Sequence, residues 1–367
     1  MLKKIKKVKC IFFVATFFIA ISLSLQTVSA AGTTENTLSA DNQTTSLVKN
    51  VTDGNTKLNV TTLKETDITK KEALNKYKKG FDIVKKYIIE NNIMINEDLD
   101  NIKYQSLILS LGTSLDYFSE SDRDEIVKLV KFIDLYENSE KNKKIKEYKS
   151  KLDTKTINQK ELSELVNLLP VSPSDPTTVL SSVYETPRAL IIQPLAYSNG
   201  YSSINARDYA YQWWDGRNPT YSNYYANYFG CSIYDECWND CTNFVSQALY
   251  AGGMKQWRGQ GVDSWYFDDG WLSSPSHSWG GAHNFYEHWK NRATLASDTS
   301  SISMGDPVNA DFERDGDINH TAIITLFSNG HFYLTQHTTD KKDNALSTWY
   351  YENYNVYVWR MSTALNY

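Results

Sequence analysis

Cys241 is the residue of this sequence whose type and position best suit covalent chemistry. It begins the stretch CTNFVSQALYA, in which apolar residues recur at three- and four-residue intervals, and Gly252-Gly253 follows. This spacing predicts a short helix with Asp240 at the N-cap position and Cys241 in the first turn. Unpaired N–H groups and the helix dipole favour an anion there, which predicts a lowered thiol pKa. An unreactive thiol packed in the core fits the position equally well. Whether a base lies close to Cys241 therefore distinguishes a nucleophile from a core residue.

Histidines on a predicted hairpin offer such a base. The chain has six histidines, and His320 opens the apolar, β-branched pattern HTAIITLF. Asn329-Gly330 then predicts a two-residue hairpin turn. Pairing outward from this turn places Ala322 opposite His337, so that His320 and His337 project from one face. The inference holds only in this register, because a shift of one residue turns one of them to the other face.

A thiol, an imidazole and a further polar group together form the arrangement of a thiol hydrolase. The imidazole takes the thiol proton and later delivers it to the leaving amine, and the third group fixes the imidazole tautomer. Our hypothesis gives the third role to His337. The residues that compete for this role are Asn319, Gln336 and Asp317. The histidines that we interpret as structural or adjacent to substrate are His277, His283 and His288.

Six sequence blocks resemble the putative amidase domain family, a bacterial branch of the NlpC-type papain-like cell-wall hydrolases. The blocks are NARDYAYQWWDGRNPTY, DCTNFVSQALYAGG, SW at 278–279, GDPV at 305–308, INHTAIIT and QHTTD. The resemblance implies a papain-like fold in which a helix carrying Cys241 packs on an antiparallel sheet carrying His320. It also implies that Cys241 and His320 are the first two catalytic residues, and it leaves the third open. The region before the first block lies outside the resemblance.

The N-terminus has the order of a secretory signal. Five lysines precede an uncharged run from Cys10 to about Gln26, and VSAA follows. We therefore expect a signal peptide over 1–30, cleaved near Ala30, and a secreted or cell-wall protein; a membrane anchor is the competing reading. Three cysteines would remain, an odd number that leaves at least one thiol unpaired. A disulfide between Cys231 and Cys237 stays open, and the spacing does not suit a zinc site.

The chain changes character near residue 180. All ten tryptophans lie at Trp213 or later, whereas the earlier part is rich in Lys, Glu and Asn. We expect a disordered polar leader over 31–68, an all-α helical region over 69–169, a Pro/Ser-containing linker over 170–198 and the hydrolase domain over 199–367. In the last of these, helical patterns precede four strand patterns: DPVNADF, INHTAIITLF, HFYLTQHTT and NVYVWRM. The predicted class is α+β.

Charge and acidic motifs narrow the possible partners. From residue 181 onward 19 acidic residues face 11 basic ones, a net charge of −8, so the sequence gives no support for nucleic-acid binding. The segment DFERDGDIN at 311–319 resembles a calcium loop. Its twelfth position would be Ala322 instead of glutamate and a strand follows, so we interpret it as an acidic turn. No cofactor or metal is expected.

These features together predict an exported cysteine-dependent amide hydrolase. Cys241 would attack and His320 would serve as general base and acid, with peptidoglycan or another cell-envelope amide as substrate. A transglutaminase-like acyl transferase would use the same pair with an amine acceptor. A non-catalytic wall-binding module would keep the fold without needing a free thiol.

Overall fold

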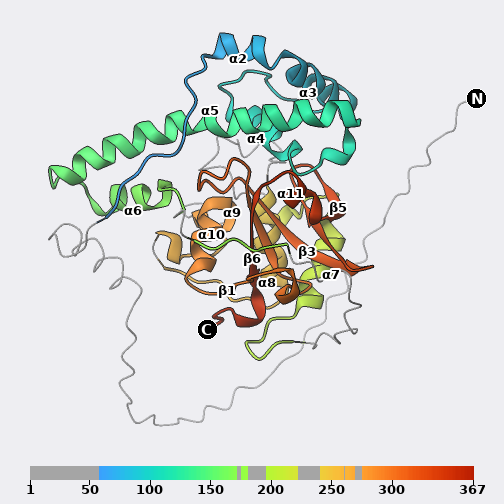
Figure 1. Cartoon of the computed structure of the whole chain (residues 1–367). Coiled ribbons are helices and arrows are strands. Elements are labelled where there is room, and N and C mark those ends of the chain that lie inside the picture. Colours follow the sequence, from blue (N-terminus) through green and yellow to red (C-terminus); the bar gives the residue numbers. More distant parts are fainter. Residues whose placement is uncertain (1–57, 172–174, 181–195, 222–239, 260, 269–274) are drawn as a thin grey trace, which may run out of the picture. The chain divides into compact units, whose positions relative to one another are not determined.

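A computed structural model describes residues 58–171, 175–180, 196–221, 240–259, 261–268 and 275–367 (Figure 1). The predicted signal peptide, most of the polar leader, much of the linker, and Cys231 and Cys237 lie outside these residues. One compact unit extends from Ser39 to Tyr367, and every element below belongs to it. No helix in the described ranges is long and apolar enough to cross a membrane.

A six-stranded antiparallel sheet lies at the centre of this unit, with the strand order β1-β6-β2-β3-β4-β5. Its central strands alternate between two buried faces, as expected for a sheet covered on both sides. The strands are β1 (Thr294–Leu295), β2 (Pro307–Asp311), β3 (His320–Ser328), β4 (His331–Gln336), β5 (Lys341–Ala345) and β6 (Asn355–Arg360). All four predicted strand patterns form strands, and the mixed α and β composition with an antiparallel sheet is confirmed.

One face of the sheet is covered by helices from the C-terminal part of the chain. Ile323, Tyr357 and Trp359 from the sheet share an apolar core with residues of these helices. Ser202 caps the first of them by accepting a hydrogen bond from the Asn205 N–H, as its sequence suggests. The helices on this side are α7 (Ser203–Trp213), α8 (Cys241–Ala251), α9 (His277–Gly280) and α10 (Ala282–Lys290).

The N-terminal helices share a core with the other face of the sheet (Figure 1). Apolar residues of these helices, among them Leu107, Ile108 and Ile133, join Ala322 and Ile324 of β3 in one buried cluster. The helical region therefore does not bury its apolar surface only within itself. The elements are α2 (Lys70–Lys76), α3 (Lys78–Glu90), α4 (Ile102–Leu111) and α5 (Glu120–Asp153), and α11 (Ser347–Tyr351) lies on the same core through Trp349. The last N-terminal helix, α6 (Gln159–Leu168), packs instead on the end of α5 in a separate apolar cluster with Ile145 and Ile157.

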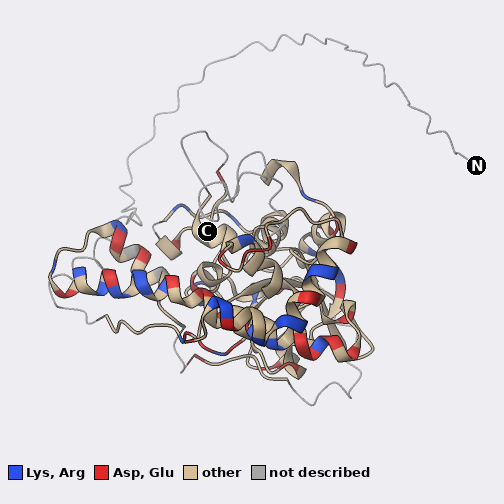
Figure 2. Ribbon diagram, turned by 90° about the horizontal axis from the view of Figure 1, so that it is seen from above, with Lys and Arg blue, Asp and Glu red and all other residues tan. Residues whose placement is uncertain are grey.

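The 34-residue helix α5 connects most of this layer. Its N-cap is Ser119, and no side chain caps it. The lysine-rich stretch EKNKKIKEYKSKL forms the second half of the same helix. Basic and acidic side chains alternate along it (Figure 2), and Lys149–Asp153 and Lys151–Glu147 pair at i,i+4 spacing, as on a solvated helix face.

The hairpin between β3 and β4 corrects the predicted register. Asn329 and Gly330 both have positive φ, at 50° and 80°, and form the expected two-residue turn. The register then shifts between Ile324 and Leu326, so that Ile323, not Ile324, pairs with Thr335. The extra residue, Thr325 of β3, forms a β-bulge. Beyond it, each side chain of β4 shares a face with the β3 residue next to the one predicted, and so lies on the opposite face from the prediction. The predicted placement of His320 and His337 on one face is therefore wrong.

Candidate functional site

Cys241 is the first residue of α8, and its side chain is 6% exposed. It is the free cysteine of the described residues. Gly253, with φ at 98°, follows the helix in the left-handed conformation expected of its C-terminal turn. Asp240 occupies the N-cap position as predicted, but its carboxylate does not cap the helix. The backbone N–H groups of the first turn therefore donate no hydrogen bond to the Asp240 carboxylate.

Two threonines fix the start of α8 beside the start of β3. The Oγ1 atoms of Thr242 and Thr321 are 2.9 Å apart, and Asn309 Nδ2 also donates to Thr321 Oγ1 over 3.0 Å. Cys241 precedes the first threonine and His320 precedes the second. The pair of hydroxyls therefore joins the segment that carries the candidate nucleophile to the segment that carries the candidate base.

Cys241 and His320 line the same cavity, which has a volume of about 840 Å³. Side chains from both layers of the protein form its walls. No hydrogen bond joins the thiol and the imidazole in the described structure, so proton transfer requires the two groups to approach each other. The further lining residues of chemical interest are Gln105, Leu109 and Ser110 of α4, Lys141 of α5, and His277, His283, Asp317 and Asn319.

Gln336, not His337, lies on the His320 side of the sheet. The bulge places Gln336 on the face of Ala322 and Ile324. Both His320 Nε2 and Gln336 Oε1 are buried, and neither has a hydrogen-bond partner in the described chain. A polar contact with Gln336 also raises the pKa of His320, against the larger effect of burial. An imidazole N–H and an amide oxygen are complementary, so Gln336 is placed to fix the His320 ring.

The Gln336 amide is held by the N-terminal layer. Its Nε2 donates to Thr113 Oγ1 over 2.8 Å and to Ser114 Oγ over 3.2 Å, and these residues directly follow α4. Ser114 Oγ in turn lies 2.5 Å from Thr339 Oγ1. No sequence pattern pointed to these contacts, because the partners are more than 200 positions apart.

His337 has a different environment. Its Nδ1 lies 3.0 Å from both carboxylate oxygens of Asp240, and its Nε2 lies 2.6 Å from the Trp213 carbonyl oxygen. The ring stacks on Phe244 of α8 with centroids 3.8 Å apart. Arg217 pairs with the same Asp240 carboxylate. Both ring nitrogens are thus engaged on the α8 side of the sheet, which leaves none to orient His320.

The other two competitors for the third role also have partners. Asn319 Nδ2 donates to Asp134 Oδ1 and its Oδ1 accepts from the Phe312 N–H, both over 2.8 Å. Asp317 pairs with Lys141 and with His283. Of the histidines interpreted as structural, His288 lies buried with Nδ1 2.9 Å from the Val262 carbonyl oxygen, whereas His277 and His283 line the cavity.

Burial controls the protonation of the candidate pair. It raises the pKa of the Cys241 thiol above its ordinary value, although contacts with Thr242 and Thr321 oppose the change. It also lowers the pKa of His320 to about 3. The predicted lowering of the thiol pKa is therefore wrong for this structure, because desolvation outweighs the effect of the helix start. Thiol and imidazole are both neutral here.

Comparisons with known proteins give one family and two relatives. Over 164 residues the chain is 32% identical to "Uncharacterized protein YhbB" of Bacillus subtilis (strain 168), covering 43% of this chain and 47% of that protein. It is 27% identical over 241 residues to "Uncharacterized protein YjcM" of the same organism, covering 62% of this chain and 47% of that protein. The chain thus spans about half the length of these relatives. No solved structure matches.

The family match coincides with the sheet and the helices that carry the site. The sequence model described as "Putative amidase domain" matches residues 200–359. This range begins just before α7 and ends within β6, and so contains both Cys241 and His320 but none of α2 to α6. Residues 200–359 are therefore an amidase-like domain, which points to amide hydrolysis in general.

Proposed function

We propose that the protein is a cysteine-dependent amide hydrolase with Cys241 as nucleophile and His320 as general base and acid. The observation that carries this proposal is the hydrogen bond between Thr242 and Thr321, which joins the start of α8 to the start of β3, together with the cavity that both Cys241 and His320 line. The match to an amidase domain over the same residues supports it. Gln336 takes the orienting role that the sequence alone assigned to His337.

The reaction begins from a neutral thiol and a neutral imidazole. His320 accepts the thiol proton as sulfur bonds to the amide carbon, and the carbonyl oxygen gains the negative charge. Backbone N–H groups at the start of α8, including that of Cys241, are suited to stabilise this oxyanion. The C–N bond then breaks while the imidazolium gives its proton to the amine. Water hydrolyses the thioester, with His320 again accepting a proton, and regenerates the thiol.

The substrate that we propose is an amide of the bacterial cell envelope, with the peptide part of peptidoglycan as the first candidate. It rests on the lysine-rich and apolar N-terminus, which has the pattern of an export signal, and on the family resemblance. An exported protein would meet such amides outside the cell. The cavity is large enough for a short peptide segment, because small-molecule sites commonly have volumes of about 300–1,000 Å³.

The test compares Cys241→Ala and His320→Gln with the wild-type protein on purified peptidoglycan. New free amines are measured by derivatisation and the products are identified by mass spectrometry. We expect both variants to lose at least about 100-fold in rate, as loss of a nucleophile or general base does. His331→Ala is the matched control, since His331 is exposed at the hairpin, and it should retain activity. Full activity of Cys241→Ala would refute the cysteine mechanism.

A further inference from the structure

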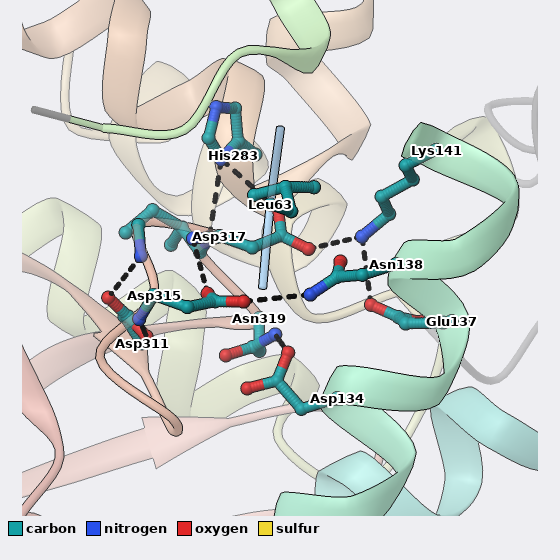
Figure 3. A network of polar contacts seen from close by, with 12 residues as sticks. Leu63, Asp134, Glu137, Asn138, Lys141, His283, Asp311, Asp315, Asp317 and Asn319 are labelled. Carbon is teal, nitrogen blue, oxygen red and sulfur yellow. Dashed lines mark hydrogen bonds and ion pairs between the residues drawn. The ribbon is translucent and has the colours of Figure 1, made fainter. Parts of the chain in front are cut away.

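The loop before His320 and helix α5 bring several carboxylates together. Asp311 ends β2, Asp315 and Asp317 lie in the following loop, and Asp134 and Glu137 come from α5 (Figure 3). Carboxylate oxygens of Asp134, Asp311 and Asp315 all lie within 4.8 Å of one another, as do those of Asp134, Glu137 and Asp317. Asp134 belongs to both groups and is completely buried.

The basic groups at this cluster do not balance its charge. Lys141 pairs with Glu137 and Asp317, and His283 contacts Asp317. Five carboxyl groups thus face one ammonium group and at most one imidazolium, so the cluster has an excess of at least three negative charges whenever all five are ionised. The Asp134, Asp311 and Asp315 group includes neither of these basic residues. Buried charges normally have a counter-charge, so this part of the cluster is neutralised either by protons or by a bound cation.

A buried amide oxygen in the same place lacks a partner. Asn138 is one helical turn after Asp134 on α5 and is 0% exposed. Its Nδ2 donates to Asp315 Oδ2 over 2.7 Å and to the Lys64 carbonyl oxygen over 2.9 Å. Its Oδ1 has no hydrogen-bond partner in the described structure. Figure 3 shows the Asn138 amide directed from α5 into the cluster, between Asp315 and the Lys141–Asp317 pair. An unused acceptor among carboxylates is what a cation ligand would look like.

We propose that Asp134 and Asn138 of α5, together with Asp311 and Asp315 of the loop, bind a calcium ion. All four supply oxygen atoms, the ligand type of hard cations. The carboxylate oxygens of the three aspartates, which lie within 4.8 Å of one another, can share one ion, because ligands on opposite sides of Ca²⁺ are separated by about twice the usual 2.3–2.6 Å bond. Three carboxylates favour Ca²⁺ over Mg²⁺, which commonly binds one or two carboxylates and keeps several waters.

The structure also accounts for the departure of DFERDGDIN from a helix-flanked calcium loop. That pattern would need an acidic ligand at Ala322, which is buried in the sheet. Asp134 of α5 approaches the loop instead, and its Oδ2 accepts a hydrogen bond from the Glu313 N–H over 3.1 Å. The ligand missing from the loop sequence is thus supplied by the N-terminal layer.

The ion would join the N-terminal layer to the start of the catalytic strand. Asp134 Oδ1 already accepts a hydrogen bond from Asn319, the residue before His320. Fixing Asp134 and the loop at one ion would hold α5 against the segment that leads into β3. Calcium is therefore expected to stabilise the fold, whatever reaction the protein catalyses.

The test measures Ca²⁺ binding to the EDTA-treated and desalted full chain by isothermal titration calorimetry and thermal unfolding. We expect one site, with a dissociation constant of about 1 mM or lower. At a 100-fold excess over that constant, Tm should rise on the order of 5 °C. Asp134→Asn and Asp315→Asn should each weaken binding at least about 10-fold. Glu140→Gln is the matched control: it removes a charge from an exposed side chain of α5 and should bind normally.

Three results would overturn the proposal. One is no heat of binding and no Tm shift up to about 10 mM CaCl₂, well above the range of extracellular calcium modules. Another is an equal loss of binding in Glu140→Gln, which would indicate nonspecific attraction by surface charge. The third is a wild-type protein that ignores Ca²⁺ while Asp134→Asn raises its Tm, since protons would then neutralise the cluster. The variants need only fold, because binding is read without a substrate.

Discussion

Replacing Gln336 with methionine tests whether the N-terminal layer takes part in orienting His320. The change keeps the length of the side chain and removes its amide. In the structure, the amide nitrogen donates to Thr113 and Ser114 on one side, and the amide has a polar contact with the His320 ring on the other. We expect Gln336→Met to release the ring without disturbing Cys241.

The expected cost in stability follows from the hydrogen bonds that are lost. The two shortest bonds from Gln336 Nε2, to Thr113 and Ser114, contribute about 0.5–1.5 kcal/mol each, so the free energy of unfolding should fall by about 1–3 kcal/mol. The partners are not orphaned, because Thr113 Oγ1 still donates to the Ser110 carbonyl oxygen and Ser114 Oγ still pairs with Thr339. The fold should therefore survive, with Tm lowered by several degrees.

The expected effect on the imidazole is more specific. His320 Nε2 should carry the proton of the neutral ring, because Gln336 Oε1 can only accept. Without Gln336 this preference should weaken, and the pKa of His320 should fall further, since the Gln336 contact raises it. General acid–base catalysis supplies about 10²–10⁴-fold, so loss of ring orientation should lower kcat by roughly 10- to 100-fold with little change in KM.

The assay is ¹⁵N NMR of the histidine ring nitrogens as a function of pH, combined with thermal unfolding and amide hydrolysis. Thr113→Val, which removes one acceptor but leaves Gln336 in place, should give a smaller change in the same direction. Gln256→Met makes the same exchange at a half-buried position outside the site and should leave His320 unchanged. An unchanged His320 tautomer and unchanged kcat in Gln336→Met would refute the assigned role, even if stability fell as calculated.

Two further predictions concern stability. Burial lowers the pKa of His288 to about 3, so the folded state binds fewer protons than the unfolded state between pH 3 and about 6.5. The free energy of unfolding is therefore highest above pH 6.5, where the imidazole is neutral in both states. It falls by about 1.4 kcal/mol per pH unit as the pH drops toward 3. The comparison is with His288→Gln, which can still donate to the Val262 carbonyl oxygen. In urea unfolding, the wild-type protein should lose stability relative to this variant between pH 6.5 and 4.5. A difference in unfolding free energy between the two proteins that does not vary with pH would contradict this. Gly305→Ala should lower the free energy of unfolding by at least about 2 kcal/mol, because φ is +89° and a new Cβ would lie 2.6 Å from Ser203 Cβ. The control is Gly216→Ala, in which the nearest neighbour of the new Cβ would be 3.9 Å away. Equal Tm values for the two variants would contradict the prediction.

The sequence predicts local features of this fold better than pairings between distant segments. Asn329-Gly330 defines its turn through residues that tolerate positive φ, and the four strand patterns follow from β-branched and apolar alternation. The bulge at Thr325 has no such signal, since neither glycine nor proline marks it. Because one inserted residue reverses the face of β4, the sequence exchanges the environments of Gln336 and His337. The contact of Gln336 with Thr113 spans 223 positions and depends on how two layers pack.

The protonation of Cys241 shows why the position of a residue on a helix is not enough to predict its chemistry. A helix N-terminus typically contributes 0.3–1 kcal/mol to an anion, less than one pKa unit, whereas full burial can shift a pKa by up to 3–5 units. Side chains of α4, including Gln105 and Leu109, line the cavity with Cys241 and His320, so part of that burial comes from outside the amidase-like domain. If water entered the cavity beside α4, it would weaken the effect of burial, which is the larger of the two. The pKa of the thiol would then fall and that of His320 would rise, which brings both groups closer to the values that proton transfer requires.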